Sequence, residues 1–391
     1  MSRSGDPLRV IIGADTFPPD VNGAARFTQR LAYGLAARGH EVHVLCPAAD
    51  RRLARPAAPG VVVHRLASYP VPVHPTFRVC WARQLARPVA ELMASIRPDV
   101  VHVQSHFAVG RTVIDAAVPE GVAVVATNHF MPENLLPYVK APARVRAAIG
   151  QRAWRDLCRI FACADVVTTP TPFAATMLRQ RGFAGEVLPI SCGIDASRYR
   201  SERTNGDAMI LFVGRLDPEK HADELLRALP LLPPRLQARV ELVGDGRCRD
   251  ALRTLANSLG IADSVRFHGL APEAALLDAY ARCAVFCMPG TAELQSIATM
   301  EAMATGRPVV AADAGALPHL VRPGENGWRY PPGNVAALAD RLTRVLDQAA
   351  AARGRMGAAS RRIIAGHDLD ATLDRFEELY RRYAVVPLAA A

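Results

Sequence analysis

Hydrophobic and polar positions alternate along the chain with two different periods. Short apolar runs predict buried strands at residues 9–15, 41–46, 61–65, 100–103, 122–127 and 166–169. Stretches in which apolar residues recur every three or four positions predict helices that run to about residue 38, over 78–95 and over 143–162. Strands that alternate with helices in this way are typical of an α/β fold, in which helices cover both faces of a parallel sheet.

The alternation stops near the middle of the chain and then starts again. Residues 201–207 are polar and predict a linker. Apolar runs at 209–213, 239–243, 265–267, 285–288 and 309–311 predict a second set of strands. We therefore expect two Rossmann-like domains, residues 1–195 and 205–367, which face each other across a ligand-binding cleft. A last amphipathic helix, within residues 368–391, presents Leu369, Leu373, Phe376 and Tyr380 on one face and is expected to pack back on the first domain.

The overall charge narrows the choice of partners. The chain has 391 residues and a formal net charge of +10, which fits a nucleotide diphosphate, an acidic membrane surface or nucleic acid. No block of Lys and Arg, zinc finger or RNA-binding motif is present, so we predict no nucleic-acid partner. The sequence shows no signal peptide and no apolar stretch of about 18 residues, and its eight cysteines include no C-x-x-C pair. We expect a cytoplasmic protein with reduced thiols, which at most rests on the inner face of a membrane.

The most informative local pattern is a pair of glutamates, Glu293 and Glu301, with seven residues between them. Glu293 follows the apolar run 285–288, so it should lie in a loop at the carboxyl end of a strand. Ser296 can cap the next helix, and Glu301 should lie about two turns into that helix. The helix start between the two carboxylates is a natural phosphate site, and the whole arrangement suits a sugar nucleotide. Two solvated glutamates on a surface helix are the alternative interpretation.

Five motifs between residues 212 and 317 resemble the retaining glycosyltransferases of family 4, which have the GT-B fold, and the resemblance covers nearly the whole chain. The Glu-x7-Glu pattern of Glu293 and Glu301 carries most of this resemblance. The other motifs are the segment Phe212–Lys220, with its Gly-Arg-Leu and a Lys five residues after the Arg, and the segments at 241–246, 265–270 and 306–317. The segment at 127–134 resembles a branch of the family that includes bacterial α-mannosyl- and glucosyltransferases acting on glycolipids.

The resemblance implies that a hexosyl group moves from a nucleotide-diphospho-sugar, GDP-mannose or a UDP-sugar, to an acceptor hydroxyl and forms an α-glycoside. Arg215 and Lys220 would neutralise the diphosphate, one as a planar fork and one as a point charge. Ordinary surface cations are the alternative. Glu301 would hold the ribose hydroxyls, and Glu293 would contact the transferred sugar and stabilise the positive charge of the transition state. No metal and no cofactor are expected, because the two cations replace a metal ion.

The resemblance also assigns residues that bind the donor or lie beside it. His129, after the strand at 122–127, would contact the sugar or the attacking group; a structural histidine is the alternative. Gln295 and Ser296 stand where the family has an aromatic residue and a glycine, so the backbone contacts would remain while the sugar contacts would change. The complete predicted donor-binding set is Gly23, Gly214, Leu270, Leu294, Gln295, Ser296, Ile297 and Glu301.

Three questions remain open at the level of sequence. The acceptor could be a glycolipid, a sugar or a natural-product scaffold. A basic helix, with Trp154 and the arginines at 144, 146, 152, 155 and 159, is either a solvated surface or a contact with anionic lipid. The alternatives for the whole protein are a GT-B sugar-nucleotide 2-epimerase and a non-catalytic basic membrane-binding protein.

His102 and His106 could suggest a metal site, but no third ligand is evident.

Overall fold

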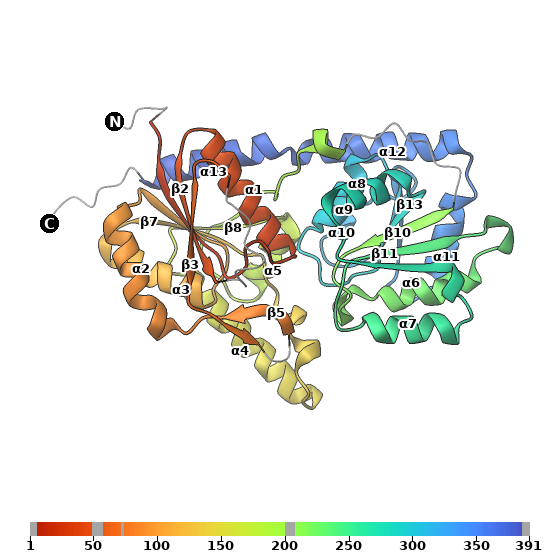
Figure 1. Ribbon diagram of the computed structural model, residues 1–391, viewed down its shortest axis with the longest axis horizontal. Coiled ribbons are helices and arrows are strands. Elements are labelled where there is room, and N and C mark those ends of the chain that lie inside the picture. The colour runs from red at the N-terminus through yellow and green to blue at the C-terminus, as the bar shows by residue number, and fades with distance from the viewer. Residues whose placement is uncertain (1–5, 49–57, 72–73, 200–207, 385–391) are drawn as a thin grey trace. The chain divides into compact units, whose positions relative to one another are not determined.

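A computed structural model describes residues 6–48, 58–71, 74–199 and 208–384. It divides the chain into two compact units, Met1–Cys192 with Asp370–Ala391 and Gly193–Leu369 (Figure 1). The expected domain ends at residues 195 and 367 thus lie two or three residues from the observed division. The expected linker at 201–207 lies outside the described residues.

The first unit is built around a seven-stranded parallel sheet with the order β3-β2-β1-β6-β7-β8-β9. The order reverses between β1 and β6, so the loops after these two strands meet at the switch point where such sheets bind ligands. The strands are β1 (Arg9–Gly13), β2 (Glu41–Pro47), β3 (Val61–Leu66), β6 (Val100–Val103), β7 (Ala123–Thr127), β8 (Val166–Thr169) and β9 (Val187–Pro189). The helices of this unit are α1 (Gly23–Ala37), α2 (Ala82–Ile96), α3 (Ala108–Ala117), α4 (Ala143–Phe161) and α5 (Pro172–Gln180).

Two expectations about local structure in this unit are wrong. The helix expected over 78–95 begins at Ala82, because residues before it form the antiparallel pair of β4 (Tyr69–Val71) and β5 (His74–Val79). The first strand ends at Gly13 and not at residue 15, since Asp15 turns its carboxylate toward the backbone N–H groups of Val109 and Gly110 at 2.9 and 3.3 Å.

The C-terminal helix α13 (Leu369–Ala384) packs on the first unit, as expected. The rings of Phe27 in α1 and Phe376 lie 5.7 Å apart, and the Tyr380 hydroxyl lies 2.6 Å from Nδ1 of His102 in β6. Leu373, Phe376 and Tyr380 are all buried, so the apolar face predicted from the sequence is the face that packs.

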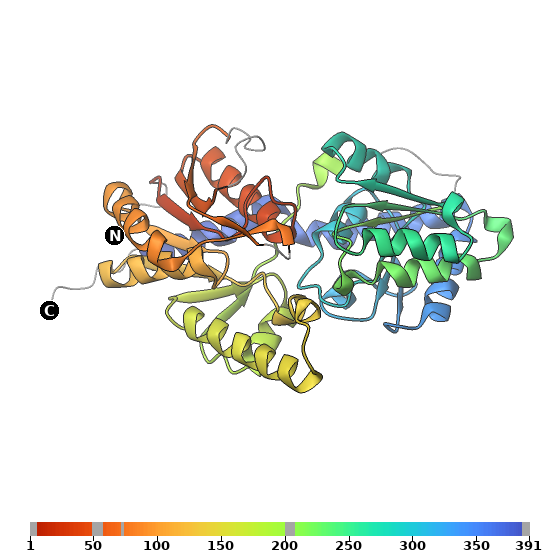
Figure 2. The same cartoon turned by 60° about the horizontal axis from the view of Figure 1, so that its bottom comes forward.

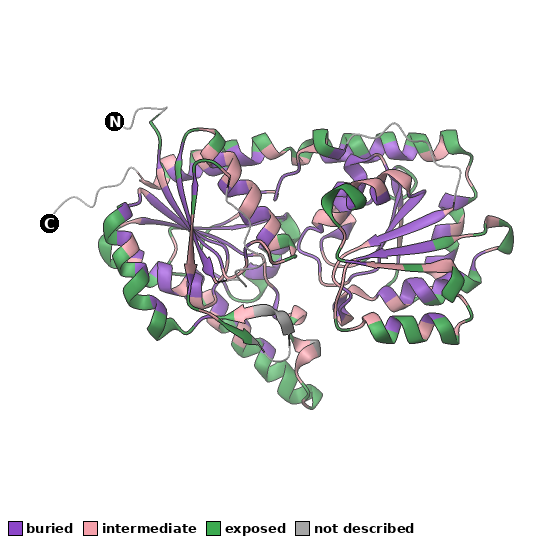
Figure 3. Ribbon diagram, in the orientation of Figure 1, coloured by how far each residue is buried: buried purple, intermediate pink, exposed green. Residues whose placement is uncertain are grey.

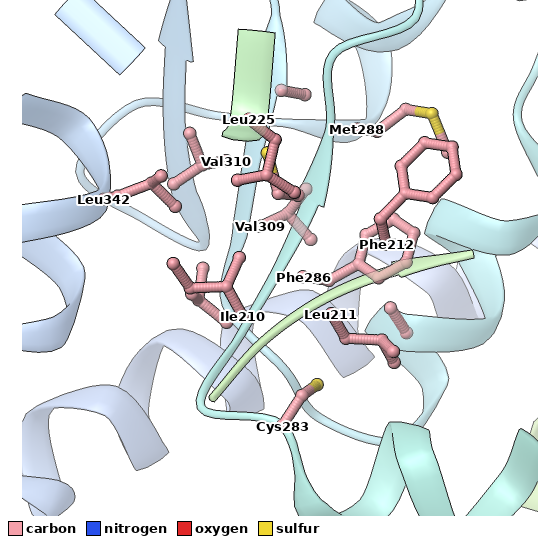
Figure 4. Close-up of a cluster of buried hydrophobic side chains, with 14 of the residues drawn as sticks. Ile210, Leu211, Phe212, Leu225, Cys283, Phe286, Met288, Val309, Val310 and Leu342 are labelled. Carbon is pink, nitrogen blue, oxygen red and sulfur yellow. The ribbon is translucent and has the colours of Figure 1, made fainter. Parts of the chain in front are cut away.

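The second unit has a six-stranded parallel sheet with the order β12-β11-β10-β13-β14-β15. Helices cover both of its faces (Figure 2), and its core includes Phe212, Phe286 and Val309 from three neighbouring strands (Figure 4). The strands are β10 (Met209–Val213), β11 (Arg239–Val243), β12 (Val265–Gly269), β13 (Val285–Met288), β14 (Val309–Ala312) and β15 (Gly327–Tyr330). The helices are α6 (Ala222–Ala228), α7 (Arg249–Ser258), α8 (Glu273–Arg282), α9 (Ile297–Ala304), α10 (Leu317–Leu320), α11 (Val335–Leu346) and α12 (Ala350–Ile364).

Candidate active site

Two neighbouring loops of the second unit carry most of the predicted donor-site residues. The strand order of its sheet reverses between β10 and β13, which pair directly with each other. The loop after β10 carries Gly214, Arg215 and Lys220, and the loop after β13 carries Glu293. Since the carboxyl ends of parallel strands lie at one edge of the sheet, the predicted cations and carboxylate meet at its switch point.

Direct contacts join the two loops. The Lys220 ammonium donates a hydrogen bond to Oε1 of Glu293, and the Thr291 N–H donates to the Glu219 carbonyl oxygen at 3.2 Å. The side chains of Lys220 and Glu293 are only 17% and 9% exposed. An ammonium group has three N–H donors, so the bond to Glu293 leaves Lys220 able to bind an anion as well.

The backbone of Glu293 is held from the loop that follows β14. Its carbonyl oxygen accepts a hydrogen bond from the Ala316 N–H at 2.9 Å. A Cβ atom on Gly315 would lie 2.7 Å from the same oxygen, and Gly315 has a left-handed φ of 56°. A glycine is therefore required for this close approach, which fixes the position from which Glu293 reaches Lys220.

The guanidinium of Arg215 is held by two carboxylates that the sequence analysis did not assign. Nη1 donates to Asp217 at 2.5 Å and Nη2 donates to Glu219 at 2.6 Å, and both acids are buried. Gly214 packs against the loop after β11, because a Cβ on Gly244 in that loop would be 1.9 Å from the Gly214 carbonyl oxygen. A signal for Asp217 and Glu219 was present in the sequence, since both acids lie within four residues of the predicted cation.

The start of α9 differs in one detail from the expectation. Ser296 is the N-cap residue, as predicted, but it has a left-handed φ of 73° and its side chain makes no capping hydrogen bond. Its hydroxyl lies 2.8 Å from that of Thr299. Leu294 and Gln295 are buried and Ile297 is half-buried. The left-handed conformation explains why a glycine suits this position, and the serine side chain does not occupy the first backbone N–H groups of the helix.

Glu301 is the fifth residue of α9, little more than one turn and not two turns into the helix. Its carboxylate is buried, with Oε1 accepting the Tyr199 hydroxyl at 2.8 Å and Oε2 accepting the Tyr280 hydroxyl at 2.9 Å. Two solvated glutamates were the alternative interpretation, and the burial of Glu293 and Glu301 shows that it is wrong. The ribose contact of Glu301 stays a prediction.

Two other predicted donor ligands lie at loop positions with exposed surface. Leu270 follows β12 and is 59% exposed. Gly23 is the exposed first residue of α1 in the first unit, and Asn22 before it caps that helix by accepting the Ala25 N–H at 2.8 Å. Both positions leave room for a ligand, and their contacts with a donor stay predictions.

His129 follows β7 in the first unit. Its Nε2 donates to Oε1 of Gln104 at 2.9 Å, and its ring lies 4.8 Å from that of Phe27. Burial lowers the pKa of His129 to about 3, so its ring is neutral at physiological pH. Since Nε2 carries the proton, Nδ1 can accept a hydrogen bond from a hydroxyl group. The sequence analysis missed Gln104, although this residue directly follows β6 beside the switch point.

The paired histidines His102 and His106 do not converge on a metal. His102 is buried in β6 between the Tyr380 hydroxyl and the Thr127 hydroxyl, each 2.6 Å away. His106 is buried against the rings of Phe107 and Phe130. Within the described part of the chain, no group of three or more His, Cys, Asp or Glu residues is arranged to hold a metal ion. Among the same residues, no helix is long and apolar enough to cross a membrane.

Comparisons with known proteins cover both units. The family model "Glycosyltransferase Family 4" matches residues 21–198, and "Glycosyl transferases group 1" matches residues 194–363. The GDP-mannose-dependent alpha-mannosyltransferase of Mycolicibacterium smegmatis is 30% identical over 91% of this chain and 92% of its own. The D-inositol 3-phosphate glycosyltransferase of Thermomonospora curvata is 30% identical over 92% of this chain and 90% of its own. The structure of sucrose-phosphate synthase from Thermosynechococcus elongatus matches with a TM-score of 0.81 at 21% identity, over 96% of this chain and 98% of that one.

Proposed function

The chain belongs to family 4 of the glycosyltransferases and has their GT-B fold, and from this premise we propose that it is a metal-independent hexosyltransferase that uses GDP-mannose. GDP-mannose is preferred over UDP-sugars because the 30%-identical relative from Mycolicibacterium smegmatis is named for this donor. The relatives are named as transferases, so a 2-epimerase is not favoured.

The contact between Lys220 and Glu293 at the sheet's switch point supports this proposal best. In the proposed reaction the bond between sugar C1 and the phosphate oxygen breaks, and the nucleoside diphosphate leaves with the electron pair. Lys220 and Arg215 neutralise the charge that develops on the leaving group. Glu293, held beside Lys220, contacts the sugar hydroxyls and stabilises the positive charge at C1.

The acceptor hydroxyl attacks C1 from the face that the diphosphate leaves, which gives the retained α-configuration that the family resemblance implies. Its proton passes to the departing phosphate oxygen. His129, neutral and with Nδ1 as an acceptor, orients a substrate hydroxyl and does not carry charge. A glycolipid, a sugar or a natural-product scaffold would each supply the hydroxyl.

The test is transfer from radiolabelled GDP-mannose, with UDP-glucose and UDP-galactose in parallel, to a panel of hydroxyl acceptors. With GDP-mannose we expect labelled product when an acceptor is present, and slow hydrolysis of the donor when it is absent. The NMR signal of the product's anomeric proton should be that of an α-glycoside. The rate should be unchanged in EDTA, because Arg215 and Lys220 supply the positive charge. A C2-epimerised donor, or no turnover of any donor, would refute the proposal.

We also propose that the start of α4 rests on an anionic membrane surface. Residues 142–149 are all exposed, and this end of α4 is green in Figure 3. Val145 and Ile149 are 47% and 41% exposed. Between Glu133 and Asp156 the sequence has no acidic residue and five basic ones, at 140, 144, 146, 152 and 155. Apolar side chains among cations suit the interface of an anionic bilayer.

Trp154 does not belong to this surface, contrary to the expectation. It is buried, and its Nε1 donates to Glu133 at 3.1 Å. The surface contact therefore rests on the first two turns of the helix alone.

Sedimentation with phosphatidylglycerol and phosphatidylcholine vesicles tests the membrane proposal. We expect binding to the anionic vesicles, and its loss in the double variant Arg144→Glu/Arg146→Glu. Arg83 and Arg87 are exposed on α2 of the same unit, and reversing both of their charges should leave binding intact. Equal losses in the two double variants would show a general charge effect and contradict the proposal.

A further inference from the structure

Three consecutive residues before α6 each contact the loop after β13. The Glu219 carbonyl oxygen accepts the Thr291 N–H at 3.2 Å, and Lys220 binds Glu293. The third residue is His221, whose Nε2 is hydrogen-bonded to the Thr291 hydroxyl at 3.2 Å. The side chain of His221 thus adds a link beside the pair on which the proposed chemistry depends.

The backbone of His221 is unusual for a histidine. It lies between the 3-10 helix η5 (Pro218–Lys220) and α6, with φ 48° and ψ 36°. This left-handed conformation is easy for glycine and unfavourable for a residue with a Cβ. Strained residues of this kind persist where the surroundings hold them, and they cluster at functional sites.

The side chain of His221 makes use of that conformation. Its ring is directed to Thr291 on one side, and its Nδ1 lies 3.7 Å from Oε1 of Glu224 on the other. Glu224 is itself fixed, because it accepts the Tyr330 hydroxyl at 2.8 Å. The ring therefore bridges the first turn of α6 and the loop that leads to Glu293.

We propose that His221 is a positioning residue for the glycosyl transfer: it fastens the loop of Lys220 to the loop of Glu293. This inference rests on the proposed function, since it gives Lys220 the role of neutralising the leaving diphosphate. A reacting group that is misplaced by a fraction of an ångström loses rate more than affinity. The effect of losing His221 should thus fall on kcat and leave the KM for the donor nearly unchanged.

The direct test uses His221→Gly, which suits the backbone, and Thr291→Val, which removes only the hydroxyl. Each should lower kcat by about 10-fold while the melting temperature stays the same. The double variant should be no slower than either single one, because both remove the same link. Gln237→Gly is the matched control: Gln237 also has a left-handed φ, 46°, and is exposed at the end of the 3-10 helix η7 (Pro234–Leu236). It should keep full kcat.

A conservative replacement separates positioning from simple loop stability. The amide nitrogen of His221→Gln can take the place of Nε2, so this variant should recover most of the kcat lost in His221→Gly. Wild-type kcat in His221→Gly, or losses that add in the double variant, would overturn the inference. Lys220→Ala distinguishes this failure from that of the proposed function. A slow Lys220→Ala with a fast His221→Gly refutes only the role of His221, whereas a fast Lys220→Ala refutes the phosphate assignment itself.

Discussion

The proposed chemistry depends on two cations in the loop after β10. Replacing either Lys220 or Arg215 by Ala should lower kcat by about 100-fold or more, because each removes a charge that stabilises the leaving diphosphate. Steady-state kinetics with the preferred donor measures the effect. Arg227→Ala is the control, since Arg227 lies on α6 with its side chain 51% exposed. Full activity in Lys220→Ala and Arg215→Ala would place the phosphate site elsewhere.

Glu301 should have a larger structural role than the sequence suggested. Removing its carboxylate takes away the acceptor used by the hydroxyls of Tyr199 and Tyr280. Glu301→Ala should therefore lower the free energy of unfolding by about 1–3 kcal/mol, measured by urea denaturation. Glu301→Gln keeps one acceptor oxygen and should be closer to wild type in stability.

The same two variants test the ribose contact. If Glu301 binds the ribose hydroxyls, Glu301→Gln should weaken the binding of the nucleoside diphosphate, measured by calorimetry, although the protein remains folded. A stable Glu301→Gln with wild-type nucleotide affinity would leave Glu301 a purely structural residue. Comparison with Tyr280→Phe separates the loss of a buried hydrogen bond from the loss of a ligand contact.

At the scale of residues, sequence could predict the chemistry of the site but not all of its contacts. The positions of Lys220 and Glu293 after two strands predict that they lie at one sheet edge, and the structure joins them. The partners of Glu301 could not be predicted in this way. Tyr280 lies on α8, and Tyr199 ends the 3-10 helix η4 (Ala196–Tyr199) just before the second unit's first strand, so only tertiary packing brings them together.

At the scale of elements, α12 is fixed to the end of α9 by a glycine contact. A Cβ on Gly357 would lie 2.0 Å from the Gly306 carbonyl oxygen, whereas a Cβ on Gly354 in the same helix meets nothing within 4 Å. Gly357→Ala should lower the free energy of unfolding by about 2 kcal/mol or more, because helix and backbone must separate. Gly354→Ala should raise it by up to about 1 kcal/mol through helix propensity.

Chemical denaturation of the two variants checks this pair. Since both changes are Gly to Ala in one helix, their intrinsic propensity terms are alike and the difference reports the contact with Gly306. Equal stabilities would mean that α12 can shift without loss, and would contradict the close packing.

The elements that sequence could predict are those with a clear period. Strands β6 and β8 were predicted at their observed bounds, because each is a short run rich in β-branched residues that follows an aspartate. Helix α3 was not predicted. Its ten residues give only three positions of the buried repeat, Val109, Val113 and Ala117, so the helical period in the sequence is short. The helix expected over 78–95 included only the last two residues of strand β5, since the strand ends at Val79 and α2 begins at Ala82.

At the scale of the whole molecule, the return of α13 to the first unit was predictable from its apolar face. The sequence could not predict the polar contacts that direct it. Arg38 at the end of α1 binds Asp374 and Glu377 at 2.6 and 3.0 Å, and the Tyr380 hydroxyl bonds to buried His102. These partners are more than 250 positions apart, and no local pattern links them.

Buried histidines of the first unit should make the fold sensitive to acid. Burial lowers the pKa of His102 to about 3 and that of His106 to about 4, whereas a histidine in the unfolded chain titrates near 6.5. The unfolded chain therefore binds protons that the folded chain excludes, so stability falls as the pH drops from about 6.5 toward 4. At pH 5 each of the two residues should lower the free energy of unfolding by about 2 kcal/mol.

His106→Leu isolates one of these contributions. Leucine fills much of the space among Phe107, Phe130 and Phe161 and takes up no proton. Urea denaturation at pH 7, 6 and 5 gives the free energy of unfolding as a function of pH. Below pH 6.5 this free energy should fall less steeply in the variant than in wild type, by about 1.4 kcal/mol per pH unit. Parallel curves for wild type and His106→Leu would show that His106 is protonated without unfolding.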